Sequence, residues 1–217
     1  GLGGATLVAV GAAAAPPIGV ALLTVGLVAG STVAALAVDR FGLGPGGHRH
    51  LTRPRLVGAL LCLVAIAISA VEGLRAASPV LLALVVVAGG LISVQQALNG
   101  RVRYATDAIV ATFVNFVVGS TALLLALGVK ELLSGVHAQR WPTEWWLYLG
   151  GPIGAVFVAV AAVVVRPLGV LRLGLAVTAG QLIGGLLLDL NRGLAARTLV
   201  AAALTMVAVA VTGRGQR

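Results

Sequence analysis

Apolar runs of nearly 20 residues follow one another along almost the whole chain, and short loops between them hold most of the charges. An α-helix needs about 20 apolar residues to cross a bilayer, and only helices or closed barrels satisfy their backbone hydrogen bonds in lipid. The runs are much longer than the roughly ten alternating residues of a barrel strand. The sequence therefore predicts an all-α fold, a polytopic bundle of transmembrane helices. We expect about eight spans, near residues 1–15, 18–37, 54–71, 79–98, 107–129, 145–165, 168–189 and 197–213.

The composition identifies lipid as the solvent of most side chains. Of 217 residues, 59% are hydrophobic and 10% are charged, and the mean hydropathy is +1.09. A soluble domain must expose much of its surface and could not hide so much apolar area. The net charge of +9 would suggest a nucleic-acid partner in a soluble protein. Here the arginines lie in short loops between apolar runs, which is the pattern that orients membrane proteins. We therefore expect a lipid bilayer and no nucleic acid.

No arrangement of residues in the sequence predicts an enzyme or a metal site. His48 and His50 share a loop without a nearby cluster of cysteines or carboxylates. No paired carboxylates and no Ser/His/Asp arrangement can be placed at one depth of the bundle. The single cysteine, Cys62, lies inside an apolar run, where a thiol usually serves packing. We therefore expect no catalytic residues, no metal and no cofactor.

An internal repeat divides the chain. Residues 1–43 align with residues 151–193 without a gap at an offset of 150, and fifteen of the 43 aligned positions are identical. A second pair of apolar stretches, 56–69 and 199–212, follows at an offset of 143 because the first copy has the longer intervening loop. Duplicated helix bundles are a common plan of membrane transporters. The repeat therefore indicates function as well as fold.

The repeat unit is predicted to contain five helices. The second copy, 79–213, is complete, whereas the first copy, 1–71, holds only the last three helices of the unit. Residues 72–78 connect the copies and residues 214–217 form a tail. Because the unit has an odd number of spans, the second copy enters the membrane from the opposite side, which predicts two inverted-topology repeats. We also expect a segment that precedes Gly1, since the first copy lacks two helices.

The distribution of Lys and Arg predicts the orientation. One side of the predicted bundle carries ten of them: Arg40, Arg49, Arg53, Arg55, Arg101, Arg103, Arg166, Arg172, Arg214 and Arg217. The other side carries five: Arg75, Lys130, Arg140, Arg192 and Arg197. The side with more positive charge faces the cytoplasm. We therefore expect the C-terminus to be cytoplasmic.

All six acidic residues lie at or outside predicted helix ends. A proton-coupled carrier often keeps a carboxylate at mid-depth, where ionisable groups are costly and are retained for function. This chain has none there. Asp39 and Asp189 occupy equivalent positions in the two copies, and we predict that they cap or gate helix ends rather than carry protons.

Uncharged polar residues form faces on several predicted helices, as their helical spacing indicates. Six of them are predicted to contact a substrate: Gln96, Asn99, Asn115, Gln181, Thr178 and Ser31. In the alternative interpretation, each side chain hydrogen-bonds a neighbouring helix, with a contribution of about 0.6–2 kcal/mol. Gln96, Asn115 and Gln181 come from three helices, which favours a shared central cavity. In the first copy Ser31 replaces Gln181, so the two copies do not carry symmetric sites.

Pairs of small residues four apart allow helices to approach closely. The pairs are Gly26/Gly30, Gly150/Gly154 and Gly180/Gly184. Packing within the chain is the first interpretation of these pairs, and a homodimer formed through one of them is the alternative.

Several short motifs together resemble a known family. In chain order they are Asn99-Gly100-Arg101, Asn115, Trp145-Trp146 before Gly150-Gly151, Pro167-Leu168-Gly169, and Ala179-Gly180-Gln181 followed by Asp189. In order and spacing they are similar to the drug/metabolite transporter (DMT) superfamily, specifically to the inner-membrane exporters of its YdcZ-like branch. The resemblance covers the second copy in full and the later part of the first. It implies a ten-helix plan of which eight helices are present, a central cavity between the halves, and a peripheral fifth helix in each unit.

These observations predict an integral membrane transporter. We expect it to export a small polar or amphipathic metabolite, or a drug-like compound, by alternating access, with the direction of transport taken from the resemblance alone. Two alternatives remain at this point. The chain could be a non-transporting membrane subunit or assembly factor, in which the polar faces only pack, or a lipid flippase, whose cavity would open sideways to lipid.

Overall fold

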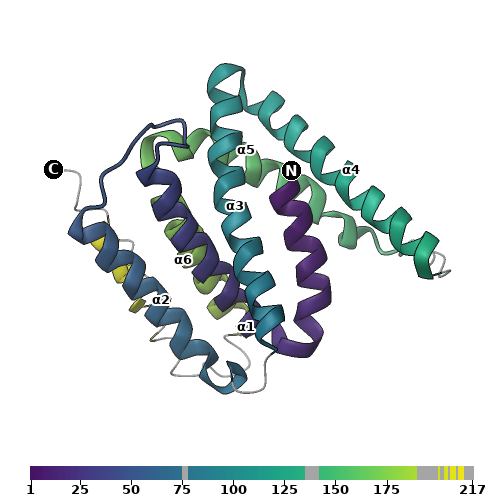
Figure 1. The fold of residues 1–217 in the computed structure, drawn as a ribbon, viewed down its shortest axis with the longest axis horizontal. Coiled ribbons are helices and arrows are strands. Elements are labelled where there is room, and N and C mark those ends of the chain that lie inside the picture. Colours follow the sequence, from purple (N-terminus) through teal and green to yellow (C-terminus); the bar gives the residue numbers. More distant parts are fainter. Residues whose placement is uncertain are drawn as a thin grey trace.

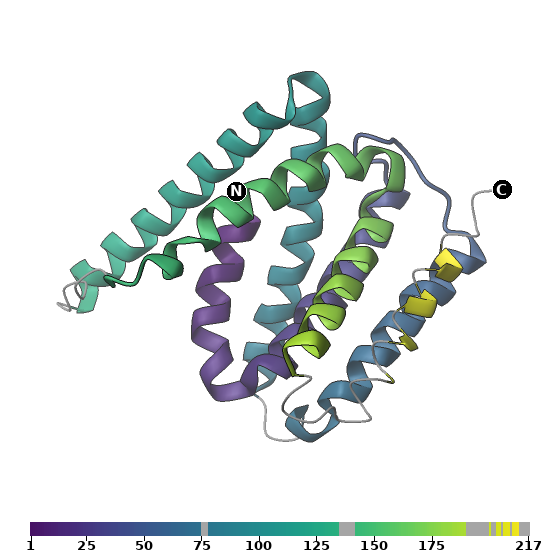
Figure 2. The ribbon, with the colours of Figure 1, turned by 180° about the vertical axis from the view of Figure 1, so that it is seen from behind.

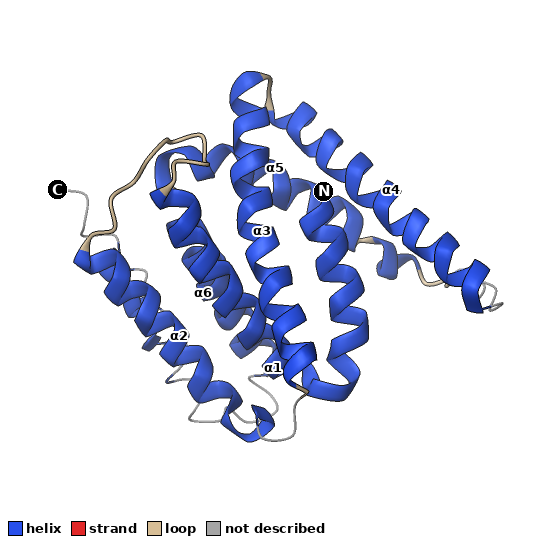
Figure 3. Ribbon diagram, viewed as in Figure 1, coloured by secondary structure: helices blue, strands red, loops and turns tan. Residues whose placement is uncertain are grey.

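The described residues of the computed structural model form an all-α bundle, as predicted (Figures 1 and 3). They are residues 1–74, 78–134 and 142–189, together with 200, 203–204, 206–208 and 210–212 in the last predicted span. The helices are α1 (Leu2–Arg40), α2 (Arg53–Leu74), α3 (Pro79–Ala105), α4 (Ala108–Ser134), the short 3-10 helix η1 (Trp145–Tyr148), α5 (Gly150–Leu168) and α6 (Val170–Asp189). The rest of the span 197–213, part of the loop 72–78 and the tail 214–217 lie outside the described residues.

The helix α1 contains both of the first two predicted spans. The backbone is helical throughout its 39 residues, and Figure 1 shows two arms that meet at a sharp bend. Pro16 and Pro17 lie inside this helix. Each proline removes a backbone donor and crowds the preceding turn, which bends a helix. The apolar stretches Leu2–Ile18 and Leu23–Arg40 are the two arms. The prediction of a break between 15 and 18 is therefore wrong for the backbone, which bends there without leaving the helix.

The equivalent junction in the second copy is a true break. Pro167 lies in the last turn of α5, and Gly169 then adopts a φ of +81° before α6 begins at Val170. Only glycine adopts this backbone region at no steric cost. Gly19, the residue aligned with Gly169, lies within the helix α1. The same Pro-x-Gly pattern therefore gives a bend in one copy and a break in the other.

The helix α3 lies at the centre of the bundle and crosses the second arm of α1 at close range. A Cβ atom on Gly30 would overlap the backbone carbonyl of Val86, and one on Gly89 would overlap the carbonyl of Leu27. The two backbones therefore meet with no side chain between them, as small residues allow in membrane helices. The Gly26/Gly30 pair thus packs within the chain, because Gly26 faces the side chain of Val85.

The helix α3 is also longer than the predicted span 79–98. It continues to Ala105, so Asn99, Gly100 and Arg101 lie within the helix and not after it. Gly100 faces Pro45 and Val165, whose side chains would be 2.7 Å or less from an added Cβ. Because Gly100 has no side chain, the loop at Pro45 and the helix α5 at Val165 can pack closely against α3. Gly100 does not end the helix.

The lipid-facing surface is strongly apolar. Four helical segments of the described residues are long and apolar enough to cross a membrane: Leu23–Arg40, Pro79–Ala105, Ala108–Leu133 and Trp145–Leu168. Leu132 and Leu133, near the end of α4, are 85% and 81% exposed. Such surface is compatible with lipid and not with water.

The described residues of the last predicted span lie beside α2. Figure 2 shows the described C-terminal residues along α2, at one edge of the bundle. Gly58 of α2 is packed so closely against Thr212 that an added Cβ would overlap its hydroxyl group. The guanidinium group of Arg172, in α6, donates to the Thr212 carbonyl at 2.6 and 3.1 Å.

Candidate functional site

Two of the predicted substrate-binding residues form a pair. The side-chain nitrogen of Asn99, in α3, donates to the side-chain oxygen of Asn115, in α4, at 2.9 Å. Asn115 is buried and Asn99 is half-buried. An asparagine amide offers two donors and one oxygen with two lone pairs, so a single hydrogen bond leaves further capacity on both residues. The pair can therefore pack two helices together and still bind a polar group.

The same segment of α3 also contacts both arms of α1. The Ser93 hydroxyl group donates to the backbone carbonyl of Ser31 at 2.7 Å. The Ser31 side chain itself donates to the Val28 carbonyl at 3.1 Å, within its own helix. Gln96 lies between Ser93 and Asn99 and is half-buried. The central part of α3 thus places Gln96 between one contact to α1 and one contact to α4.

A neighbouring glutamine has a contact that the sequence did not assign. Gln95 accepts the backbone N–H of Gly4 at 3.0 Å through its side-chain oxygen, which fixes the first arm of α1 against α3. The pattern of faces singled out Gln96, because it shares a face with Ser93 and Asn99. Gln95 contacts an adjacent element, and only the position of the first arm reveals this contact.

The predicted residues of α6 lie apart from the asparagine pair. The Thr178 side chain is buried, and its hydroxyl group donates to the Gly174 carbonyl one turn earlier at 3.0 Å. Gln181 is exposed. In the described part of the chain α6 contacts α3 but not α4. The structure therefore joins Asn99 to Asn115, with Gln96 one turn before Asn99 on α3, and leaves Thr178 and Gln181 on a third helix. Asp189 ends α6, and its side chain lies outside the described residues.

Asp39 joins three helices at one end of the bundle. Its carboxylate accepts the backbone N–H groups of Val170 at 2.9 Å and Leu171 at 3.2 Å, at the start of α6. It also forms an ion pair with Arg55, near the start of α2. The side chains of Asp39 and Arg55 are only 3% and 7% exposed. A carboxylate at a helix N-terminus satisfies unpaired N–H groups and interacts favourably with the helix dipole.

We call this end the basic end, defined by the loop 41–52, the C-terminal turns of α3 and α5, and the start of α6. A second arginine, Arg49, reaches it from the loop. Its guanidinium group donates to the backbone carbonyls of Arg166 at 2.8 Å and Pro167 at 3.0 Å. Arg101 donates to the carbonyl of Gly42 at 2.9 Å. These bonds hold the loop against the α5–α6 junction and against α3.

The helices, their apolar outer surface and the polar contacts between them define an integral membrane protein that crosses the bilayer several times. The family described as "Putative inner membrane exporter, YdcZ" matches residues 1–68 and 80–215. The chain belongs to this family. It is similar to the inner membrane protein YdcZ of Escherichia coli (strain K12), with 30% identity over 112 residues that cover 51% of this chain and 75% of the relative. No solved structure matches the chain. The resemblance noted from the motifs is confirmed, and the chain is a membrane transporter by its family.

Proposed function

We propose that this protein exports a small polar or amphipathic molecule across the inner membrane by alternating access. The observation that carries the proposal is the hydrogen bond between the side chains of Asn99 and Asn115. Gln96 lies about one helical turn before Asn99 on α3. These three amides lie in apolar helices, where an unpaired polar group costs several kcal/mol. Gln181 and Thr178 would complete the site from α6 once a substrate lies between the helices.

The two halves of the chain supply the moving parts of the proposed mechanism. Transporters built from inverted repeats alternate by moving one repeat against the other around a fixed central site. Asp39 links the first copy to α6 of the second copy, so it would act as the closure of the basic end. Opening toward that end requires the Asp39 carboxylate to release the α6 N–H groups or to move with them. The distribution of arginines supports a cytoplasmic position of this end.

A flux assay tests the proposal. The full-length protein would be reconstituted in liposomes and screened with a panel of labelled metabolites, and each active substrate would then be tested on Gln96→Leu and Asn115→Leu. We expect both variants to reduce flux while the protein still inserts and folds. Gln95→Leu is the matched control, because Gln95 accepts the Gly4 N–H. It should lower the thermal stability and leave the flux per folded molecule unchanged.

The outcomes separate the proposal from its alternatives. A non-transporting subunit would show no flux with any substrate, and Asn115→Leu would only lower its stability. A flippase would move labelled lipid between leaflets and ignore soluble metabolites. Cysteine labelling at position 181, in a variant that also carries Cys62→Ala, adds an independent measurement. A water-soluble reagent should react there if Gln181 lines a wet path, and protection by a transported substrate would support its role in binding.

A further inference from the structure

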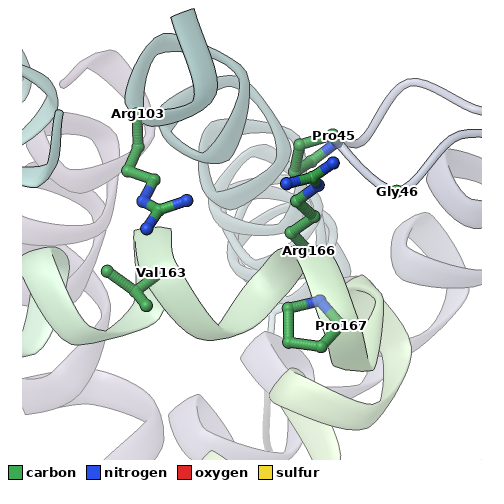
Figure 4. Close-up of a pocket in the computed structure, with 6 residues that line it drawn as sticks. All are labelled: Pro45, Gly46, Arg103, Val163, Arg166 and Pro167. Atoms are coloured by element: carbon green, nitrogen blue, oxygen red, sulfur yellow. The ribbon is translucent and has the colours of Figure 1, made fainter. Parts of the chain in front are cut away.

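An open pocket lies at the basic end, between α3, α5 and the loop 41–52. Its volume is about 540 Å³, and it is lined by Pro45, Gly46, Arg103, Val163, Arg166 and Pro167. Figure 4 shows Arg103 of α3 and Arg166 of α5 on opposite sides of the pocket. Pockets of roughly 300–1,000 Å³ are the size that binds small molecules. The substrate site proposed above involves none of these residues.

The two arginines face the pocket without a carboxylate. No acidic side chain lines it, and the ion pair between Arg55 and Asp39 involves neither of the two arginines. The guanidinium carbon of Arg166 lies over the ring of Tyr104, 4.1 Å from its centroid. A guanidinium group that stacks on an aromatic ring can still donate hydrogen bonds from the N–H groups at its edge. The positive charge of the pocket is therefore not neutralised by a neighbouring acid.

The C-terminal carbonyl groups of α5 are hydrogen-bonded by an arginine. The carbonyl groups at a helix C-terminus carry partial negative charge and would repel an anion. Arg49 donates to the carbonyls of Arg166 and Pro167, which are two of these groups. Arg49 therefore satisfies the carbonyl groups at the end of α5. The guanidinium group of Arg166 is not used for this purpose and can donate hydrogen bonds to a ligand in the pocket.

The wall formed by the loop is fixed. Pro45 packs on Gly100 of α3, where an added Cβ would lie 2.7 Å from the proline ring. Gly46 fits between the Arg166 carbonyl and the Arg49 guanidinium group, at 2.8 and 3.0 Å from a Cβ built on it. A pocket with fixed walls binds a ligand without a large ordering cost.

From these observations we propose that this pocket binds a phosphate group. Two guanidinium groups on opposite sides present several N–H donors to the oxygens of a phosphate, which is the anion that arginine recognises best together with carboxylate. The phosphate belongs either to the headgroup of an anionic lipid or to a soluble phosphate compound. Basic pockets between helices are a recurring site of anionic lipid headgroups.

The test uses the purified full-length protein in micelles of a maltoside detergent, which carries no phosphate. In one arm inorganic phosphate is titrated, and in the other arm phosphatidylglycerol is added to the micelles. Bound lipid is counted by native mass spectrometry, and binding of either probe is followed by the shift in the melting temperature. The variants are Arg103→Gln and Arg166→Gln. Arg53→Gln is the matched control, because Arg53 is exposed and does not line the pocket.

We expect one of the two probes to bind saturably and each variant to weaken it at least about tenfold, which is the size of one lost charge-assisted hydrogen bond. Retention of phosphatidylglycerol assigns the site to a lipid headgroup, and a saturable shift with inorganic phosphate assigns it to a soluble ligand. Arg103→Lys and Arg166→Lys keep the charge and should keep part of the binding, which separates binding from folding. The proposal is overturned if neither probe binds, or if Arg53→Gln weakens binding as much as the pocket variants.

Discussion

Asp39 gives the sharpest prediction about the stability of the bundle. Its carboxylate has three partners in a site where its own side chain is 3% exposed. Asp39→Ala leaves Arg55 as an uncompensated buried charge, which costs about 3–5 kcal/mol. It also removes the acceptor of two N–H groups at the start of α6, which adds about 1 kcal/mol. We therefore expect a loss of about 4 kcal/mol or more in the free energy of unfolding.

Removing the other partner should cost less. Arg55→Met leaves the carboxylate with the N–H groups of Val170 and Leu171 and with the positive end of α6. The loss is then close to that of one hydrogen bond to a charged group, about 1.5–3 kcal/mol. The double variant should lose less than the sum of the two single variants, because no lone buried charge remains.

Reversible unfolding in mixed micelles, followed by circular dichroism, measures these free energies. Asp107→Ala is the control, because Asp107 is exposed and its carboxylate accepts the Val110 N–H at the start of α4, at 2.8 Å. Its loss should be about 1 kcal/mol or less. Equal losses for Asp39→Ala and Asp107→Ala, or a larger loss for Arg55→Met than for Asp39→Ala, would refute the three-partner account.

Three further predictions concern single positions. Gly30→Ala should destabilise the fold by about 1–3 kcal/mol, because the added Cβ would overlap the Val86 carbonyl. Gly11→Ala is the control and should be neutral or stabilising, because nothing lies within 4 Å of the added Cβ. Equal melting temperatures of the two variants would contradict this prediction. Gly169→Ala places a side chain at a φ of +81° and a ψ of 163° and should cost about 1–3 kcal/mol in the same unfolding measurement. A reporter fused after Arg217 should be active only if it works in the cytoplasm, and activity of an export-dependent reporter there would reverse the orientation.

Where the sequence predicted the structure well, the local signals agreed with one another. The span predicted at 54–71 is α2, and the span at 168–189 is α6. In both places an apolar run of full length follows a proline at or near its start. The family was also identified correctly from its motifs, because these motifs are short but keep their order and spacing.

The errors arose where packing changed the meaning of a local signal. The spans predicted at 1–15 and 18–37 belong to one continuous helix, α1, which contains Pro16 and Pro17 at its bend. The helix α3 continues past the end predicted for the span 79–98, and Gly100 in this extension allows the close approach of Pro45. A single sequence cannot show which segment will pack against a glycine.

The same limit applies to the candidate site. The spacing of polar residues selected Gln96, Asn99 and Asn115, and two of these three are in contact. It did not reveal that Gln95 fixes the first arm of α1, or that Asp39 caps a helix 131 residues further along the chain. Such partners depend on how distant helices are arranged, and helical periodicity carries no information on that arrangement.

The bend of α1 has a consequence for the lipid around the protein. Its arms, Leu2–Ile18 and Leu23–Arg40, contain 17 and 18 residues, so each is about 26–27 Å long at 1.5 Å per residue. The hydrocarbon core of a bilayer is about 30 Å thick. A hairpin of two short arms is matched by local thinning of the bilayer at a small cost for each ångström of mismatch. The prolines at the bend then lie close to the headgroups, whose water can hydrogen-bond the carbonyl groups that the prolines leave unpaired. The thickness of the host membrane thus becomes a variable that acts on this hairpin more than on the longer helices α3 and α4.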